Sequence, residues 1–225
     1  YQAVSGHFEW ESKGPQKNLR SIFSIHPESV TLVASENSGI AAMGDLRGKR
    51  VNLGGREGTG QIRNVRDLLS AFGIGENELD AHYLKPADAP GLLQKNEIDA
   101  LFFTVGHPNT NIKEATSGGV AVRLIPIHGR EIEALLNKYS YYASSIIPFN
   151  LYPEALNKED IPSFGVKATL VALEKTPEDL VYAVAREVFE NLEALKGLHP
   201  AFQVLTKENM MTGLSAPIHR GALKY

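Results

Sequence analysis

The sequence predicts an α/β fold, and three observations support this class. Apolar runs typical of buried strands alternate along the chain with stretches that repeat apolar residues at helical spacing. A glycine-rich turn separates the first clear strand from the first clear helix. The chain has 225 residues, of which 43% are hydrophobic, enough for one core or two small ones that share a hinge. Strands that alternate with helices in this way indicate a doubly wound sheet.

The first elements that we expect are two strand segments between residues 19 and 34. Apolar residues gather on both sides of His26-Pro27. Because proline cannot donate to a strand ladder, we expect the strand to break there. A strand interrupted in this way suits a crossing between two lobes. Residues 6–18 mix Gly, Pro, Lys and Glu, and we expect them to form a surface loop.

The next segment combines a strand at 51–53, a glycine-rich turn and an amphipathic helix at 62–72. The turn leaves backbone N–H groups bare, and the first N–H groups of a helix have no partner within it. The helix dipole adds positive potential at the same place. We therefore expect Thr59, Gly60 and Gln61 to form an anion cradle that holds a carboxylate. The glycines fit neither the dinucleotide pattern G-x-G-x-x-G nor a phosphate-binding loop.

A third segment, at 98–105, is a nearly unbroken apolar run that reads as a strand buried on both faces. It ends in a polar turn that contains Thr104, Gly106, His107 and Asn109. Ligands in open α/β sheets bind at the carboxyl ends of strands, so this turn is a second candidate part of the site. His107 has two interpretations, a donor to the ligand or a cap for a helix beside the following proline.

The remaining elements follow from the same patterns. Thr176-Pro177-Glu178-Asp179 predicts a helix start, with a threonine cap, proline at the first position and an acidic residue behind it. We expect that helix to continue to Leu195 on a broad apolar face. The other expected elements are a short strand at 83–84, a short helix at 86–95, a strand at 122–127, a helix at 130–139, a proline-rich connector at 139–163 and a strand at 164–173.

The composition argues against several functions. The chain has no cysteine, which rules out disulfides, thiolate nucleophiles and cysteine-ligated metals. Its 23 basic and 26 acidic residues are interspersed, which gives no indication of a nucleic-acid or membrane-surface partner. The histidines never fall within one helical turn of each other, and no serine lies in G-x-S-x-G. We therefore predict no metal, no cofactor and no catalytic residue.

Several motifs, in this order along the chain, resemble those of one family. They are Asp45-Leu46-Arg47-Gly48-Lys49-Arg50-Val51, Gly58-Thr59-Gly60-Gln61, Ile98-Asp99-Ala100-Leu101-Phe102-Phe103, Gly106-His107-Pro108, Leu124-Ile125-Pro126-Ile127, Lys138-Tyr139-Ser140-Tyr141-Tyr142, Gly165-Val166-Lys167-Ala168-Thr169-Leu170-Val171 and Gly213-Leu214-Ser215-Ala216-Pro217-Ile218-His219. The ordered set resembles the TAXI (TRAP-associated extracytoplasmic immunogenic) solute-binding proteins, which serve tripartite ATP-independent periplasmic (TRAP) transporters.

The resemblance implies a periplasmic binding protein-like fold of the second topological type. Two doubly wound lobes, joined by crossover strands, would close on a ligand in the cleft between them. Residues 1–27 and 162–225 would be the remainder of lobe I, and 28–161 would be lobe II, with hinge segments near 22–31 and 147–165. Because the family begins with a signal peptide in the precursor and further N-terminal elements, we expect the first lobe to be incomplete in this chain.

The resemblance also implies a function and a set of ligand-binding residues. The expected function is a periplasmic or otherwise extracytoplasmic receptor for a small organic anion, a glutamate-like amino acid or a dicarboxylate. It would be a monomer, not an enzyme, and would deliver the solute to TRAP-type membrane permease subunits. The alternatives are the ligand-binding input domain of a sensor or an enzyme on the same fold. The ligand-facing residues carried over from the family are Thr59, Gly60, Gln61, Thr104, Gly106 and His107, with Asn109 and Tyr142 as further candidates.

Overall fold

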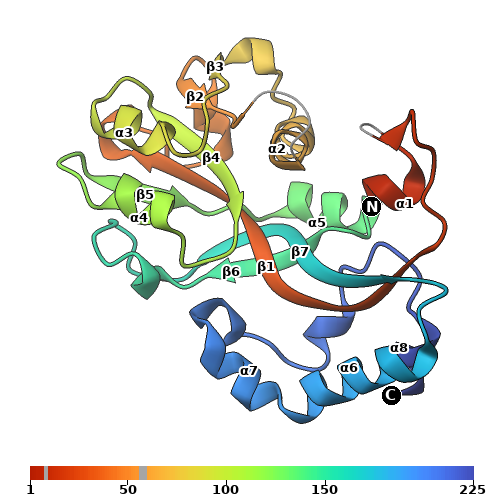
Figure 1. Cartoon of the computed structure of the whole chain (residues 1–225). Coiled ribbons are helices and arrows are strands. Elements are labelled where there is room, and N and C mark those ends of the chain that lie inside the picture. The colour runs from red at the N-terminus through yellow and green to blue at the C-terminus, as the bar shows by residue number, and fades with distance from the viewer. Residues whose placement is uncertain (8–9, 56–59) are drawn as a thin grey trace. The chain divides into compact units, whose positions relative to one another are not determined.

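The computed structural model describes residues 1–7, 10–55 and 60–225 (Figure 1). Its strands are β1 (Leu19–Ser35), β2 (Arg50–Asn52), β3 (Asp80–His82), β4 (Ala100–Val105), β5 (Val122–Ile125), β6 (Ala143–Ile147) and β7 (Ile161–Leu173). Its α-helices are α1 (Gln2–Ser5), α2 (Gly60–Ala71), α3 (Ala89–Gln94), α4 (Thr110–Thr116), α5 (Arg130–Lys138), α6 (Glu178–Glu190), α7 (Leu192–Leu198) and α8 (Arg220–Lys224). Within those described ranges, no helix is long and apolar enough to cross a membrane.

The strands hydrogen-bond in the order β3-β2-β4-β1-β7-β6, and β5 pairs with β1 off this path. The chain divides into two compact units. Unit 1 comprises Tyr1–Pro27, Ser140–Ala143 and Val166–Tyr225, and unit 2 comprises Glu28–Tyr139 and Ser144–Gly165. The division falls within β1 and within β7, so both long strands belong to both units. That these places act as hinges between lobes stays a prediction.

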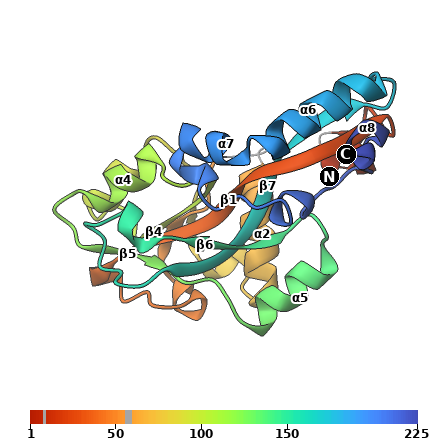
Figure 2. The ribbon, with the colours of Figure 1, turned by 90° about the horizontal axis from the view of Figure 1, so that it is seen from below.

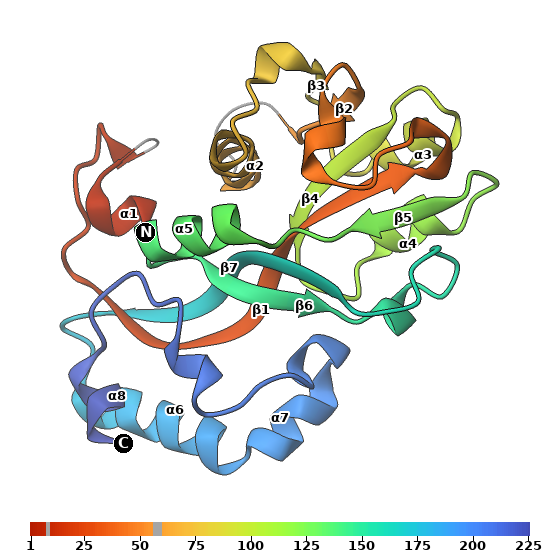
Figure 3. The ribbon, with the colours of Figure 1, turned by 180° about the vertical axis from the view of Figure 1, so that it is seen from behind.

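Unit 2 is built on a mixed sheet. β2 pairs in parallel with β3 and β4, and the second half of β1 pairs antiparallel with β4 and with β5. Helices cover both faces, with α4 on one face and α2 and α5 on the other (Figure 2). Helices α2 and α5 also lie side by side (Figures 1 and 3).

The two faces of β4 pack against different helices, because successive side chains of a strand point to opposite sides. Leu101, Phe103 and Val105 belong to a core cluster with the buried residues of α3 and α4. Phe102 and Thr104 therefore face the side of the sheet on which α2 lies. This alternation decides which polar groups at the end of β4 can meet.

Unit 1 has a separate core. Ile22 and Phe23 of β1 pack with Val181, Ala185 and Phe189 of α6, and Figure 2 shows α6 lying along the first half of β1. Helix α8 packs against the start of α6, where its second residue, Gly221, comes very close. A Cβ atom at that glycine would lie 2.3 Å from the carbonyl oxygen of Glu178, so the two helices meet this closely only without a side chain there.

The predicted α/β class is confirmed, as an open mixed sheet with helices. The helices expected at 62–72 and 130–139 are α2 and α5, and the strands expected at 98–105 and 122–127 are β4 and β5. In each of these four, short-range apolar periodicity agrees with the packing found.

The predicted break in the first strand is wrong, because β1 runs without interruption through His26-Pro27. The ladder to β4 begins at Ser29, two residues past the proline, so Pro27 removes no hydrogen bond from it. The strand expected at 83–84 is also misplaced. The short strand β3 ends at His82, and the backbone N–H of Leu84 donates to the side chain of Asn52.

The connector expected at 139–163 contains strand β6 and the first three residues of β7. The predicted long helix from Thr176 to Leu195 is also wrong in two respects. Helix α6 begins after Pro177 with no side-chain cap, and it ends at Glu190 with Asn191 as its C-cap. The Asn191 side chain donates to the carbonyl oxygen of Glu187 at 2.9 Å, and such local side-chain bonds compete with the helical pattern. Helix α7 follows as a separate element.

Candidate functional site

The candidate site lies in unit 2, where α2 begins after the carboxyl end of β2 and passes Phe102 and Thr104 of β4. Asn52 at the end of β2 is opposite Leu101 of β4, and both strands run in the same direction. The helix has 12 residues, and its first residue, Gly60, is exposed. Its first backbone N–H groups have no partner within the helix and carry the positive end of the helix dipole. This end of α2 can therefore attract a negatively charged group.

Gln61 ties the start of α2 to β4. Its side-chain Nε2 donates to the carbonyl oxygen of Phe102 at 3.0 Å. Gly54, which follows β2 with φ of 101°, makes room for this amide, since a Cβ at Gly54 would lie 2.2 Å from the Gln61 Nε2. The backbone N–H of Gly54 donates to Asn52 Oδ1 at 3.3 Å. The glycine after the strand is thus needed for the position of Gln61.

Thr104 of β4 lies beside α2, one helical turn beyond Gln61. The buried amide of Asn64 donates through Nδ2 to Thr104 Oγ1 at 3.4 Å. Thr104 is half-buried, and its hydroxyl can donate its own proton to an oxygen of a ligand. The structure therefore brings together three of the predicted residues, Gly60, Gln61 and Thr104, on the α2 side of the sheet.

His107 takes part in a different network. Its Nε2 lies 2.9 Å from Thr31 Oγ1, and its Nδ1 lies 2.6 Å from the hydroxyl of Tyr152. The Thr31 hydroxyl donates to the carbonyl oxygen of Ser29, so the proton between Thr31 and His107 must come from Nε2. The Tyr152 hydroxyl then donates to Nδ1, and it accepts the backbone N–H of Asn109 at 2.9 Å. Both nitrogens of the imidazole are used within this network.

Burial keeps this network neutral. It lowers the pKa of His107 from 6.5 to about 4, and it raises the pKa of Tyr152 to about 12 against a smaller opposing effect of the Asn109 N–H. Thr31 lies opposite Phe103, on the sheet face that packs against α3 and α4. The His107 ring therefore lies on the other face of the sheet from Asn64 and Thr104.

The other predicted residues have these positions. Gly106 is half-buried between the end of β4 and His107. The Asn109 side chain caps α4, accepting the backbone N–H groups of Asn111 and Ile112. Tyr142 belongs to unit 1, is 5% exposed, and has its ring centroid 4.6 Å from that of Tyr141. Thr59, together with residues 56–58, lies outside the described residues.

Sequence reasoning missed Asn64 and Tyr152. Asn64 could have been found from the sequence, because it is a polar residue among the apolar positions of the α2 face. In the structure its side chain is only 5% exposed. Tyr152 carries no local signal, because it lies 45 residues from His107 in a segment without clear periodicity.

Two charged residues near the site have partners of their own. Arg63 Nε lies 3.0 Å from Asp67 Oδ1, one turn along α2. Asp99 binds the side chain and the backbone N–H of Arg50, and the hydrogen bond from the Arg50 side chain lowers the pKa of Asp99. In the part of the chain that the structure describes, no group of three or more His, Cys, Asp or Glu is placed to hold a metal ion.

The fold is a mixed α/β fold, an open sheet with helices, and its candidate ligand-binding groups lie around the start of α2. The chain belongs to the NMT1-like family, which it matches over residues 1–225.

Several solved structures are similar to this chain. The periplasmic aliphatic sulphonate binding protein SsuA from Escherichia coli is 16% identical, with a TM-score of 0.42 over 83% of this chain and 48% of that one. The ligand-binding component of an ABC-type import system from Staphylococcus aureus is 11% identical, with a TM-score of 0.43 over 89% and 58%. Substrate-binding domain 2 of GlnP from Lactococcus lactis is 15% identical, with a TM-score of 0.41 over 86% and 62%. The chain spans about half the length of the sulphonate-binding protein.

Proposed function

We propose that this chain is part of an extracytoplasmic solute receptor that binds a small organic anion and delivers it to a TRAP-type membrane permease. The proposed solute is a glutamate-like amino acid or a dicarboxylate. The ordered set of motifs, which resembles that of TAXI solute-binding proteins, supports this class. The observation that carries the proposal is the start of α2, whose first residue, Gly60, is exposed, after the carboxyl end of β2 and beside Phe102 and Thr104 of β4.

The proposed contacts with the carboxylate come from uncharged donors. The backbone N–H groups of Gly60 and Gln61 and the hydroxyl of Thr104 donate to its oxygens. Hydrogen bonds from backbone N–H groups to an ionised acceptor are stronger than bonds between neutral groups. A helix N-terminus supplies such donors already aligned, so little ordering is needed when the ligand binds.

His107 has a supporting role in this proposal. Both of its nitrogens bind protein groups, and together with Tyr152 it fixes the turn that follows β4. Gly106 and Asn109 belong to the same turn, and the Asn109 side chain caps α4. With a pKa of about 4 and no free lone pair, this imidazole is a poor general base at neutral pH. We therefore propose that this strand end supports ligand binding, and that the protein is a binding protein and not an enzyme.

The test is a ligand titration with matched threonine variants. Calorimetric titration and thermal unfolding are measured with glutamate, succinate and malate, and with an alkanesulfonate and arginine for comparison. We expect Thr104→Val, which removes one hydroxyl, to weaken binding of the carboxylate by about tenfold. Thr169→Val is the control, since Thr169 is also a half-buried strand threonine, on β7 in unit 1, with a single bond to the carbonyl oxygen of Lys167.

Two results would overturn the proposal. The first is that no carboxylate in the series binds. The second is that Thr104→Val and Thr169→Val both bind the carboxylate with the affinity of the unsubstituted chain. Chemical conversion of any of these compounds, followed by proton NMR of the mixture, would favour an enzyme instead.

A further inference from the structure

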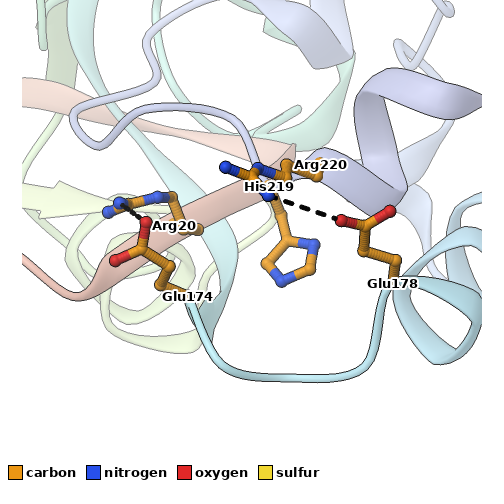
Figure 4. A pocket seen from close by; sticks show the side chains of 5 residues that line it. All are labelled: Arg20, Glu174, Glu178, His219 and Arg220. Atoms are coloured by element: carbon orange, nitrogen blue, oxygen red, sulfur yellow. Dashed lines mark ion pairs between the residues drawn. The ribbon is translucent and has the colours of Figure 1, made fainter.

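Unit 1 contains a small pocket at the start of α6 (Figure 4). Its volume is about 130 Å³, and charged or polar side chains from β1, from the segment before α6, and from α6 and α8 line it. These residues are Arg20, Glu174, Glu178, His219 and Arg220. In Figure 4 the imidazole of His219 lies between the two glutamates.

His219 lines this pocket, and one of its two ring nitrogens lacks a hydrogen-bond partner among the described residues. The residue is 2% exposed, and its Nδ1 accepts the backbone N–H of Gly221 at 3.1 Å, which caps α8. Because Nδ1 accepts a hydrogen bond, the proton of the neutral ring is on Nε2. Nε2 is buried and has no hydrogen-bond partner among the described residues. A buried donor without an acceptor loses its hydration and gains nothing in return, so an acceptor is expected beside it.

The ring proton decides which kind of group fits. A metal ion needs the lone pair of Nε2, and that nitrogen carries the proton while Nδ1 caps α8. The partner is therefore a hydrogen-bond acceptor such as an oxygen atom. A pocket of about 130 Å³ has room for a small ion of several heavy atoms as well as for water.

The lining has two arginines and two glutamates, so an anion is favoured only where a guanidinium can leave its carboxylate. The guanidinium of Arg20 already has partners, since it lies 2.6 Å from the Glu174 carboxylate and donates to the carbonyl oxygens of Lys17 and Leu19. Arg220 is held loosely, with its side chain 83% exposed and its Nη1 3.9 Å from Glu178 Oε1.

The pocket also meets the N-terminus of α6, a helix of 13 residues whose first N–H groups receive no side-chain cap. Glu178 and Asp179 stand in its first turn, and Asp179 lies 3.6 Å from Lys224 Nζ. A loosely held arginine, an uncapped helix start and a buried N–H without a described partner thus belong to residues that line one pocket.

We propose that this pocket binds a small oxyanion, a sulfate or carboxylate group. His219 Nε2–H and the guanidinium of Arg220 donate to its oxygens. Arg220 moves from Glu178 to the ion, and Glu178 turns toward solvent, where half of its side chain is already exposed. The site belongs to unit 1 alone and does not depend on the solute site proposed in unit 2.

The test uses a variant that removes the Nε2 donor and keeps the cap. In His219→Asn, the side-chain oxygen takes the place of Nδ1, because asparagine is a good N-cap residue. His199→Asn is the matched control, since His199 Nδ1 caps a short 3-10 helix in the same way, by accepting the N–H of Ala201 at 3.1 Å, and it is exposed. Arg220→Gln tests the second donor.

The probes are sodium sulfate and sodium acetate, added at constant ionic strength with sodium chloride as the reference. We expect the Nε2–H resonance of His219 to shift and saturate with sulfate or acetate, and thermal unfolding of the chain to move upward. His219→Asn should lose the saturable part of the stabilisation by sulfate, and Arg220→Gln should weaken sulfate binding about tenfold. His199→Asn should leave the response to sulfate unchanged, and the Nε2–H resonance of His219 reports on unit 1 alone, which separates this site from the carboxylate site of unit 2.

Three results would overturn the inference. The Nε2–H resonance does not respond to either ion, the response never saturates, or His219→Asn is stabilised by sulfate as much as His199→Asn. A long-lived water molecule detected beside Nε2–H by a nuclear Overhauser effect, unchanged by either ion, would show that water is the partner instead.

Discussion

Acid should destabilise this protein through His107, and the structure gives the size of the effect. The pKa of His107 is about 4 in the folded chain, because the ring is buried, against an ordinary value of 6.5. Between these values the unfolded chain binds a proton that the folded chain does not bind. The free energy of unfolding therefore falls as the pH falls from about 6.5 to about 4, and the loss is complete below that range. At 1.36 kcal/mol per pKa unit, the full loss is about 3 kcal/mol.

The assay is urea unfolding of the unsubstituted chain and of His107→Gln at about pH 7.5 and about pH 4.5. Glutamine keeps a donor for Thr31 and an acceptor for the Tyr152 hydroxyl, and it does not titrate. All carboxylates titrate alike in both proteins, so the difference between their pH dependences isolates His107. We expect the unsubstituted chain to lose about 2.5 kcal/mol more than His107→Gln over this range. His128→Gln, at an exposed histidine, is the control and should behave as the unsubstituted chain.

Equal pH dependences of the unsubstituted chain and His107→Gln would refute the reasoning. An NMR titration gives an independent check, since the ring protons of His107 should not titrate until the pH approaches 4. A midpoint near 6.5 would mean that the ring is hydrated and that the network with Thr31 and Tyr152 does not form in solution.

Two further substitutions test the packing. Tyr152→Phe leaves His107 Nδ1 and a backbone N–H of the next turn without their shared partner, and we expect it to lower the free energy of urea unfolding by about 1–3 kcal/mol; an unchanged midpoint would contradict this. Gly221→Ala places a methyl group 2.3 Å from the carbonyl oxygen of Glu178, and overpacking of this kind costs about 1–3 kcal/mol. Gly119→Ala, where no atom lies within 4 Å of the new methyl group, should cost much less, and equal losses at the two glycines would show that α6 and α8 do not pack closely.

The elements that sequence reasoning found are those whose pattern is local. Helices α2 and α5 and strand β4 have apolar residues at the spacing of their own secondary structure, so a short window contains the information. Strand β6 lacks such a pattern, because Ser144 and Ser145 interrupt its apolar residues. Of its five residues, Ile147 belongs to the core cluster of unit 2. Its pairing with β7 depends on residues that are remote in the chain.

The site shows the same limit. The position of Gln61 beside β4 follows from a strand, a turn and a helix that are consecutive in the sequence. The hydrogen bonds of the His107 ring depend on Thr31 and Tyr152, which lie 76 and 45 residues away in the chain. No pattern near His107 distinguishes a ring that is free to bind a ligand from one whose two nitrogens are already used.

The two faces of β4 differ in whether their polar groups already bind each other. On the face toward α3 and α4, His107, Thr31 and Tyr152 are buried and bind each other, so a ligand there would have to break bonds that the fold already has. On the face toward α2, Thr104 is half-buried, its hydroxyl accepts a single long bond from Asn64, and the first residue of the helix, Gly60, is exposed. Among the described residues, a ligand on this face adds hydrogen bonds without breaking any that they make. Net binding energy comes from that difference, and it is the reason to expect the carboxylate beside Gln61 and Thr104 with His107 as its structural support.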